Sequence, residues 1–149
     1  MKITNVTAHV FEQPGAKDSI LEITQVPTLK RMQFTHTRKP IDRPAHIYVM
    51  RVATDEGVEG LCMTRASIGP ISSLVELLRA NVIGKDPLNR EYLFQKLHLG
   101  TRWVYQKPGW FGSFDNCLWD IAGKVAGLPV CKLMGKVRDG VPVYQTAGD

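Results

Sequence analysis

The chain has 149 residues, of which 44% are hydrophobic, so it can bury one core of ordinary size but not two. Its formal net charge is +5, no apolar run reaches the ~18 residues of a membrane span, and its first residues lack a signal-peptide core. Three cysteines at scattered spacings, Cys62, Cys117 and Cys131, argue against a disulfide framework and a zinc motif. We therefore expect a single cytoplasmic domain with buried, reduced thiols and no membrane partner.

Three segments have the composition of β-strands. Ile3 to Phe11 alternates apolar and polar residues, which predicts a strand with one buried face. His46 to Thr54 is β-branched and apolar, and a short turn leads from it into a third run, Val58 to Thr64. Gly57 in that turn supplies the positive φ that a short hairpin loop requires. The sequence therefore predicts three antiparallel strands in chain order.

About thirty residues separate the first two predicted strands. Pro14 to Arg43 has no clean periodicity, and a loop of that length in a compact domain is usually functional or disordered. Most of the chain's net charge lies here. Residues 30–43 carry a net charge of +4, from Lys30, Arg31, Arg38, Lys39 and Arg43 against Asp42. The segment is expected to be functional as a whole, and the alternative is a solvated loop whose charges serve only solubility.

Two apolar stripes at helical spacing follow the strands. The first comes after Gly69-Pro70, and the second begins at Asp86-Pro87, where a proline suits the first helical turn. The first stripe consists of Ile71, Leu74, Val75, Leu78 and Val82, and the second of Leu88, Tyr92, Leu93 and Leu97. Each stripe predicts a helix with one face on a core.

A third stripe gives the clearest helix signal. It consists of Phe114, Cys117, Leu118, Ile121, Ala122 and Val125. Ser113 is the predicted N-cap, Asp120 and Lys124 are spaced for an i, i+4 ion pair, and Gly127 ends the helix.

A short final helix is predicted from Pro129 to Met134, with a proline at its start and Gly135 after its end. The chain contains no internal repeat and no low-complexity linker. Strands followed by helices predict an α+β fold, in which a three-stranded antiparallel meander precedes a bundle of three to four helices.

The residues near the C-terminus are more specific than their helix pattern. Ser113 to Gly135 reads SFDNCLWDIAGKVAGLPVCKLMG, and VPVY follows at residues 141–144. This stretch resembles the N-terminal capping domain of mandelate racemase and muconate lactonizing enzymes, within the enolase superfamily, most closely from Asp115 to Tyr144. The matching positions are Ser113, Phe114, Asp115, Leu118, Trp119, Asp120, Gly123, Lys124, Gly127, Pro129, Leu133 and Gly135. Met134 and Lys136 depart from the family pattern, and both substitutions are conservative.

The resemblance implies roles for two loops. In that family the loop after the first strand folds over the mouth of a barrel and contacts carboxylate substrates, which makes His36 and Arg38 candidate substrate-binding residues. The loop after the third strand reaches the same pocket and offers Arg65, beside Thr64 and Ser67. The alternative for Arg65 is an ion pair with a carboxylate on the sheet.

Other conspicuous residues have structural interpretations. Trp119 and Asp115 identify the family, and we interpret them as packing and interdomain residues without a chemical role. His9 and His46 lie in predicted strands and His98 near a helix end, so each is expected to be a structural hydrogen-bonding residue.

The catalytic groups that the resemblance implies are expected outside this chain. Family members abstract the proton α to a carboxylate with a Lys or His base, and Mg²⁺ held by three acidic residues at barrel strand ends stabilises the enediolate. Residues 141–149 resemble only the first barrel strand, where Thr146 is a candidate for contact with substrate. We therefore expect a capping domain over residues 1–139 and the start of a barrel at residues 140–149. The chain alone is expected to hold no metal and to be inactive.

The resemblance implies a Mg²⁺-dependent acid-sugar dehydratase as the full-length parent, with a racemase or a cycloisomerase as the alternatives. The expected partners are an acid-sugar carboxylate, the chain's own barrel domain and further copies in a homo-oligomer. The substrate and the identity of the base stay open.

Two hypotheses come from other classes of protein. The pI of 9.2 and the charged segment 30–43 fit a stand-alone module that binds nucleic acid or another polyanion. Interleaved stacking aromatics and nucleic-acid-binding motifs are missing, so we do not expect a nucleic-acid partner. The last hypothesis is a stand-alone domain that oligomerises through the surface that a barrel would cover.

Overall fold

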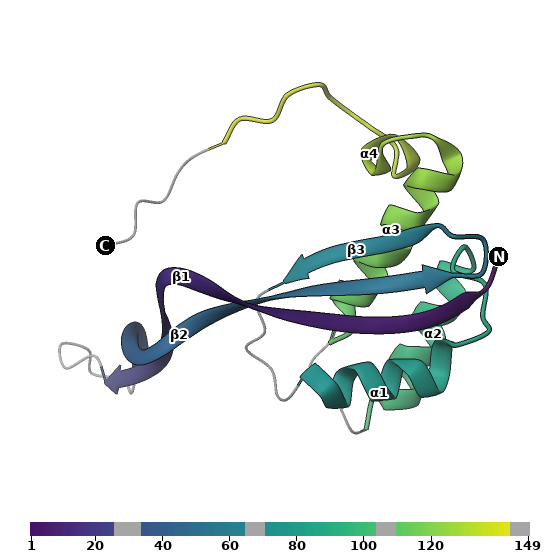
Figure 1. The fold of residues 1–149 in the computed structure, drawn as a ribbon. Helices are drawn as coiled ribbons and strands as arrows, with labels where there is room; N and C mark the ends of the chain where they lie inside the picture. Colours follow the sequence, from purple (N-terminus) through teal and green to yellow (C-terminus); the bar gives the residue numbers. More distant parts are fainter. Residues whose placement is uncertain (26–33, 65–70, 104–109, 144–149) are drawn as a thin grey trace.

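The protein folds as a three-stranded sheet followed by helices. The structure is a computed structural model, and it describes residues 1–25, 34–64, 71–103 and 110–143. The strands β1 (Ile3–Gln25), β2 (Phe34–Thr54) and β3 (Glu59–Thr64) are antiparallel and lie in the order β1-β2-β3 (Figure 1). The helices of the described residues are α1 (Ile71–Val82), α2 (Arg90–Thr101), α3 (Gly112–Ala126) and α4 (Val130–Leu133). The predicted α+β class and the order of strands and helices are confirmed.

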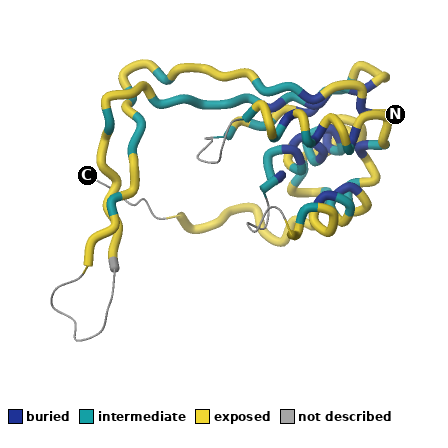
Figure 2. Tube along the Cα trace, turned by 90° about the horizontal axis from the view of Figure 1, so that it is seen from below, coloured by how far each residue is buried: buried dark blue, intermediate teal, exposed yellow. Residues whose placement is uncertain are grey.

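The helices cover one face of the sheet, which we call the inner face (Figures 1 and 2). Alternate strand residues point to opposite faces, and Val6, Met50 and Val52 are buried on the inner face. They pack against residues of the helices, and of the turn before α3, that are almost inaccessible to solvent: Leu78, Val82, Leu93, Leu97, Phe111, Phe114, Cys117, Leu118 and Ile121. One core therefore joins the sheet to α1, α2 and α3.

The close approach of α3 to β3 depends on Gly60. A Cβ atom at this position would lie 2.1 Å from the carbonyl oxygen of Cys117, which no real contact allows.

The predicted ion pair between Asp120 and Lys124 is confirmed, at 2.7 Å. These two side chains also bind the open edge of β3. Asp120 Oδ2 accepts the N–H of Leu61 at 2.8 Å, and Lys124 Nζ donates to the carbonyl oxygen of Glu59 at 2.7 Å.

The three thiols differ in their surroundings. Cys117 is buried as predicted, its Sγ lies 3.5 Å from the carbonyl oxygen of Met50, and burial raises the pKa of the thiol to about 12. Cys62 is only half-buried, and Cys131 is exposed because α4 buries none of its residues. The expectation of buried thiols is therefore wrong for these two.

Two helix starts differ from the prediction. Helix α3 begins at Gly112, so Ser113 lies inside the first turn and Phe111, held in the core, occupies the N-cap position. Helix α2 begins at Arg90, because Asp86 Oδ1 accepts the N–H of Leu88 at 2.9 Å and forms a turn first. Of the four residues in the predicted stripe, Leu88, which precedes the helix, and Tyr92 are exposed, whereas Leu93 and Leu97 are buried as predicted.

The glycines predicted to end elements do so. Gly57, Gly127 and Gly135 all have positive φ, and Gly127 donates its N–H to the carbonyl oxygen of Lys124 at 3.3 Å. Val125, the last member of the third stripe, is nearly half exposed because it lies at the end of α3 beyond the sheet.

None of the helices in the described parts of the chain is long and apolar enough to cross a membrane.

β1 and β2 continue together beyond the sheet as a two-stranded ribbon, defined here as residues 12–25 and 34–46. The prediction of a loop from Pro14 to Arg43 is therefore wrong for the described residues. Among the described residues, no helix or third strand lies on the ribbon (Figure 1), so neither face is buried and the apolar alternation that marks a strand is missing. Pro40 and Pro44 are tolerated because β2 has only one neighbouring strand here.

Candidate substrate-facing site

His36 and Arg38 lie on the same face of the ribbon. In the register of β1 and β2, Ile23 lies opposite His36 and Leu21 lies opposite Arg38. Directly opposed residues share a face, and residues two apart on a strand are about 7 Å apart. We call this four-residue surface the Arg38 face. It combines two nitrogen-bearing side chains with Leu21 and Ile23, which are 60% and 71% exposed.

The other cationic side chains of the ribbon are paired across the two strands. Lys39 lies 2.5 Å from Glu22, and Lys17 lies 3.1 Å from Asp42. Arg43 Nε donates to Asp18 Oδ2 at 3.0 Å. This hydrogen bond, followed by one from the N–H of Ser19, lowers the pKa of the Asp18 carboxyl. Among the described residues, Arg38 is the cationic side chain of the ribbon that forms no ion pair.

These pairs change the expected electrostatics of the segment. The ribbon carries four acidic and four basic side chains, so its formal net charge is zero: Glu12, Asp18, Glu22 and Asp42 against Lys17, Arg38, Lys39 and Arg43. The described part of the cationic segment, residues 34–43, carries a net charge of +2, and the net charge of −2 over residues 12–25 of β1 compensates it, which the chain order conceals. Lys30 and Arg31 lie outside the described residues. The observation weakens the polyanion-binding hypothesis, because that hypothesis needs a basic surface.

A bulge redirects the ribbon. The register between β1 and β2 shifts between Glu12 and Lys17 and again before Ser19, and Gly15 has a φ of 74°. Figure 2 shows that the ribbon turns, beyond this bulge, toward the side of the sheet on which the helices lie. Residues 136–143 also run on that side (Figures 1 and 2). The ribbon and this C-terminal segment thus flank the same side of the domain.

Two of the candidate residues cannot be placed. Arg65 and Thr146, together with Ser67 beside Arg65, lie outside the described residues. Their roles in substrate contact stay predictions.

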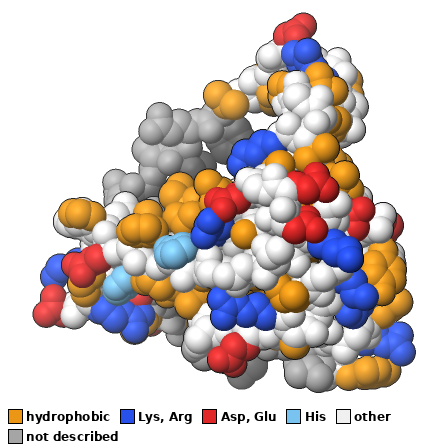
Figure 3. All heavy atoms as spheres, turned by 45° about the vertical axis from the view of Figure 1, so that its right-hand side comes forward, with side chains coloured by type: hydrophobic (Ala, Val, Ile, Leu, Met, Phe, Trp, Pro, Cys, Tyr) orange, Lys and Arg blue, Asp and Glu red, His pale blue; other side chains and the backbone are white. Residues whose placement is uncertain are grey.

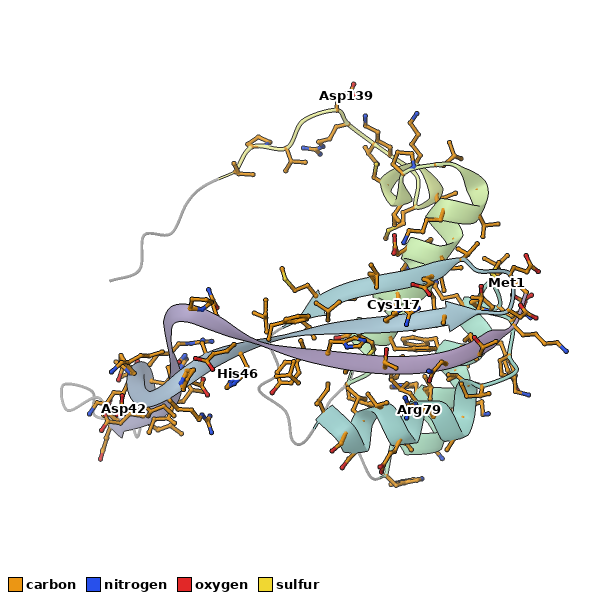
Figure 4. The ribbon with its side chains drawn as sticks, viewed as in Figure 1. Met1, Asp42, His46, Arg79, Cys117 and Asp139 are labelled. Carbon is orange, nitrogen blue, oxygen red and sulfur yellow. The ribbon has the colours of Figure 1, made fainter. Side chains whose placement is uncertain are left out.

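The other histidines have local contacts. His9 Nε2 lies 3.3 Å from the hydroxyl of Thr7, and the ring of His98 stacks on Phe94 with 5.7 Å between centroids. His46 lies on the ribbon near its junction with the sheet, away from the labelled Asp42 farther out (Figure 4). His9 thus has a hydrogen-bonding partner, as expected, whereas the contact of His98 is a ring stack and its hydrogen-bonding role stays a prediction.

Sequence reasoning missed a partner for the two family-diagnostic residues. Arg90 Nη1 donates to both carboxylate oxygens of Asp115, at 2.9 and 3.2 Å, and its guanidinium lies 4.4 Å from the centre of the Trp119 ring. Asp115 and Trp119 therefore fasten α3 to the start of α2. Arg90 follows the turn at Asp86, and no spacing in the sequence indicates this contact. The interdomain role of Trp119 stays a prediction.

The described residues contain no group of three or more His, Cys, Asp or Glu side chains arranged to hold a metal ion. The Mg²⁺ that the family resemblance implies therefore has no set of ligands in this part of the chain.

The comparisons with known proteins agree with this architecture. The N-terminal domain family of mandelate racemase and muconate lactonizing enzymes matches residues 23–135, and the chain belongs to this family. A D-galactonate dehydratase family member of Oceanicola granulosus is 37% identical over 123 residues, which are 76% of this chain and 29% of the relative. A D-mannonate dehydratase of Novosphingobium aromaticivorans is 31% identical over 122 residues, which are 76% of this chain and 30% of that enzyme.

Solved structures show the same relationship. D-glucarate dehydratase from Agrobacterium tumefaciens, crystallised with magnesium, superimposes with a TM-score of 0.64 at 26% identity, over 93% of this chain and 34% of that one. The chain thus spans about three-tenths of the length of the curated relatives it matches. The fold and the family are those of an enolase-superfamily capping domain.

Proposed function

We propose that residues 1–139 are the capping domain of a longer acid-sugar dehydratase, and that residues 140–149 begin the barrel that carries its catalytic groups. Two observations support the proposal. The relatives that share the capping domain bear dehydratase names and are about three times as long as the matched segment. The ribbon and residues 136–143 flank one side of the domain, which leaves a common place for a barrel (Figure 2).

The Arg38 face is the observation that carries the substrate assignment. An unpaired guanidinium can form two parallel hydrogen bonds with a carboxylate, whereas a paired one must first release its partner. Leu21 lies opposite Arg38 and Ile23 lies opposite His36, and both side chains would exclude water once a barrel covered them. We therefore assign Arg38 to the carboxylate of an acid sugar and His36 to a neighbouring oxygen of the same molecule.

In this function the chain binds, orients and shields the substrate, while proton abstraction belongs to the barrel. When bound in the parent, Mg²⁺ would stabilise the negative charge that develops on the substrate carboxylate. The described residues supply no ligands for it, so its site is expected in the barrel.

The first test measures the mass of the native polypeptide in the source cells with an antibody raised against this domain. We expect a polypeptide larger than 16.7 kDa by roughly a 250-residue barrel. A native polypeptide of 16.7 kDa would overturn the assignment as a capping domain.

The second test addresses the substrate contact in the full-length enzyme. Replacing Arg38 by Gln should lower kcat/KM for the preferred acid sugar by about 10- to 100-fold, the effect of losing hydrogen bonds to a charged group. Lys39→Gln is the matched control, because Lys39 is the next residue, points to the opposite ribbon face and is paired with Glu22. Equal activity of both variants would exclude Arg38 from the site and leave the domain assignment intact.

A further inference from the structure

The Arg38 face is divided into a polar row and an apolar row. His36 and Arg38 form the polar row on β2, and Leu21 and Ile23 form the apolar row on β1. Opposed residues of the two rows lie about 5 Å apart, and the two residues within a row lie about 7 Å apart. All four side chains are exposed. A small molecule on this face would therefore meet nitrogen-bearing groups along one side and aliphatic groups along the other.

The opposite face of the ribbon is arranged differently. Ile20 lies there opposite Lys39, and the ammonium group of Lys39 lies 2.5 Å from Glu22. The cation beside Ile20 is therefore already occupied by a carboxylate of the protein, whereas Arg38 is not. Figure 3 shows hydrophobic side chains and histidines among side chains of both charges on the left of the molecule, the side on which the ribbon extends. The Arg38 face thus differs from the opposite face in its free guanidinium beside apolar side chains.

The length of the two rows suits a six-carbon acid sugar. If the carboxylate lies on Arg38, the carbon chain extends along the rows toward His36 and Ile23. An extended six-carbon chain matches the distance of about 7 Å between these positions. The last carbon of the sugar would then lie beside Ile23, while His36 reaches a hydroxyl group on a neighbouring carbon.

The surroundings of that last carbon favour a methyl group. The side chain of Ile23 has no donor or acceptor, so a hydroxyl group buried against it would lose its hydrogen bonds to water. A methyl group would instead bury apolar surface against apolar surface. A second carboxylate at this carbon would need a cation, and the other basic side chains of the described ribbon, Lys17, Lys39 and Arg43, are paired.

We infer that the full-length enzyme prefers acid sugars that end in a methyl group at the carbon farthest from the carboxylate, and that Ile23 selects them. The inference rests on the proposed function, because it requires that the substrate lies on the Arg38 face. It goes beyond that function by naming the terminal group of the substrate. The expected order of preference is a methyl group, then a hydroxymethyl group, then a carboxylate.

The test compares matched six-carbon acid sugars in the full-length enzyme. Within each set the sugars share one configuration and differ only at the last carbon, which carries a methyl, a hydroxymethyl or a carboxylate group. We expect kcat/KM for dehydration to be about 10-fold higher for the methyl sugar than for the hydroxymethyl sugar, the effect of one apolar contact.

Ile23→Thr should bring kcat/KM for the methyl and hydroxymethyl sugars close to each other, because it replaces a methyl contact by a hydroxyl group. The matched control is Ile20→Thr, the same change on the same strand at a residue that faces the other way. This control should keep the preference of the unmodified enzyme. Both variants retain a β-branched side chain at an exposed strand position, so both should fold.

The outcomes separate the inference from the proposed function. Turnover of acid sugars without a preference for the methyl sugar would overturn the inference and leave the proposed function intact. A preference for the methyl sugar that survives in Ile23→Thr, or that is lost equally in Ile20→Thr, would overturn the assignment to Ile23. If no acid sugar is dehydrated, the proposed function and the inference fail together.

Discussion

The same two strands behave differently along their lengths. Within the sheet, β1 and β2 bury Val6, Met50 and Val52 almost completely under the helices. In the ribbon, Ile23 of the same strand β1 is 71% exposed. A strand therefore does not need a buried face to form, because ladder hydrogen bonds and cross-strand ion pairs hold the ribbon in register. Stability should come from the sheet and helices, whereas the ribbon offers the proposed substrate contact.

The largest expected effect tests this division directly. Replacing Phe114 by Ala removes a fully buried ring from the core and should lower the free energy of unfolding by about 4 kcal/mol. Ile23→Ala in the ribbon should change it by less than about 0.5 kcal/mol, since its side chain is already in water. Urea unfolding followed by circular dichroism measures both values. Similar losses for the two variants would show that the ribbon belongs to the cooperative core.

The contact between α3 and β3 gives the next largest effect. Gly60→Ala should destabilise the domain by about 3 kcal/mol, because the new methyl group would overlap the carbonyl oxygen of Cys117 and force the helix away. Gly100→Ala in α2 is the control, since a Cβ there meets no atom within 4 Å. The control should stabilise the domain by up to about 1 kcal/mol through helix propensity. Thermal unfolding of the two variants should thus shift in opposite directions.

A smaller effect is expected at the junction of α2 and α3. Arg90→Ala removes the contacts with Asp115 and Trp119 and should cost about 2 kcal/mol. Arg51→Ala should cost less than Arg90→Ala, because the Arg51–Glu59 pair is more exposed than the Arg90–Asp115 pair. Equal losses in chemical denaturation would contradict the assignment of Arg90 to the junction.

The sequence predicts those elements that have one buried face and one exposed face. The stripes through Leu78, Leu93 and Phe114 and the strand around Val52 all pack on one core, and their periodicity indicates this. Periodicity does not predict the ribbon because both of its faces are exposed to solvent. Its residues therefore pair across the two strands without alternating between apolar and polar. Pairs such as Asp18 with Arg43 join residues 25 positions apart, and such pairs follow only from the register.

Only part of the arrangement of the candidate site can be predicted from the sequence, because the ribbon lacks the apolar alternation that marks a strand. The sequence indicates His36 and Arg38 only as members of a cationic segment, and the structure places them on one face and pairs the neighbouring cationic side chains with carboxylates. Residues two apart on a strand point to the same face, so identifying the segment as a strand would have placed His36 and Arg38 on one face. The role of Arg90 depends on the relative position of two helices, which no local pattern encodes.

The smallest expected effect is confined to the ribbon and depends on pH. The Arg43 guanidinium lowers the pKa of Asp18 below the ordinary value of 3.8 for an aspartate, so the ionised carboxylate stabilises the closed ribbon at neutral pH. This contribution is present above the ordinary pKa and is lost as the pH falls through the lowered one. Nuclear Overhauser effects between Ser19 and Pro40, which are paired in the register, should therefore weaken below about pH 4. Signals from Val6 and Val52 in the sheet should stay unchanged over that range if the ribbon opens independently. The variant Asp18→Asn should remove the contribution of Asp18 to the pH dependence. A simultaneous loss of sheet signals would instead mean that the ribbon and the core unfold as one unit.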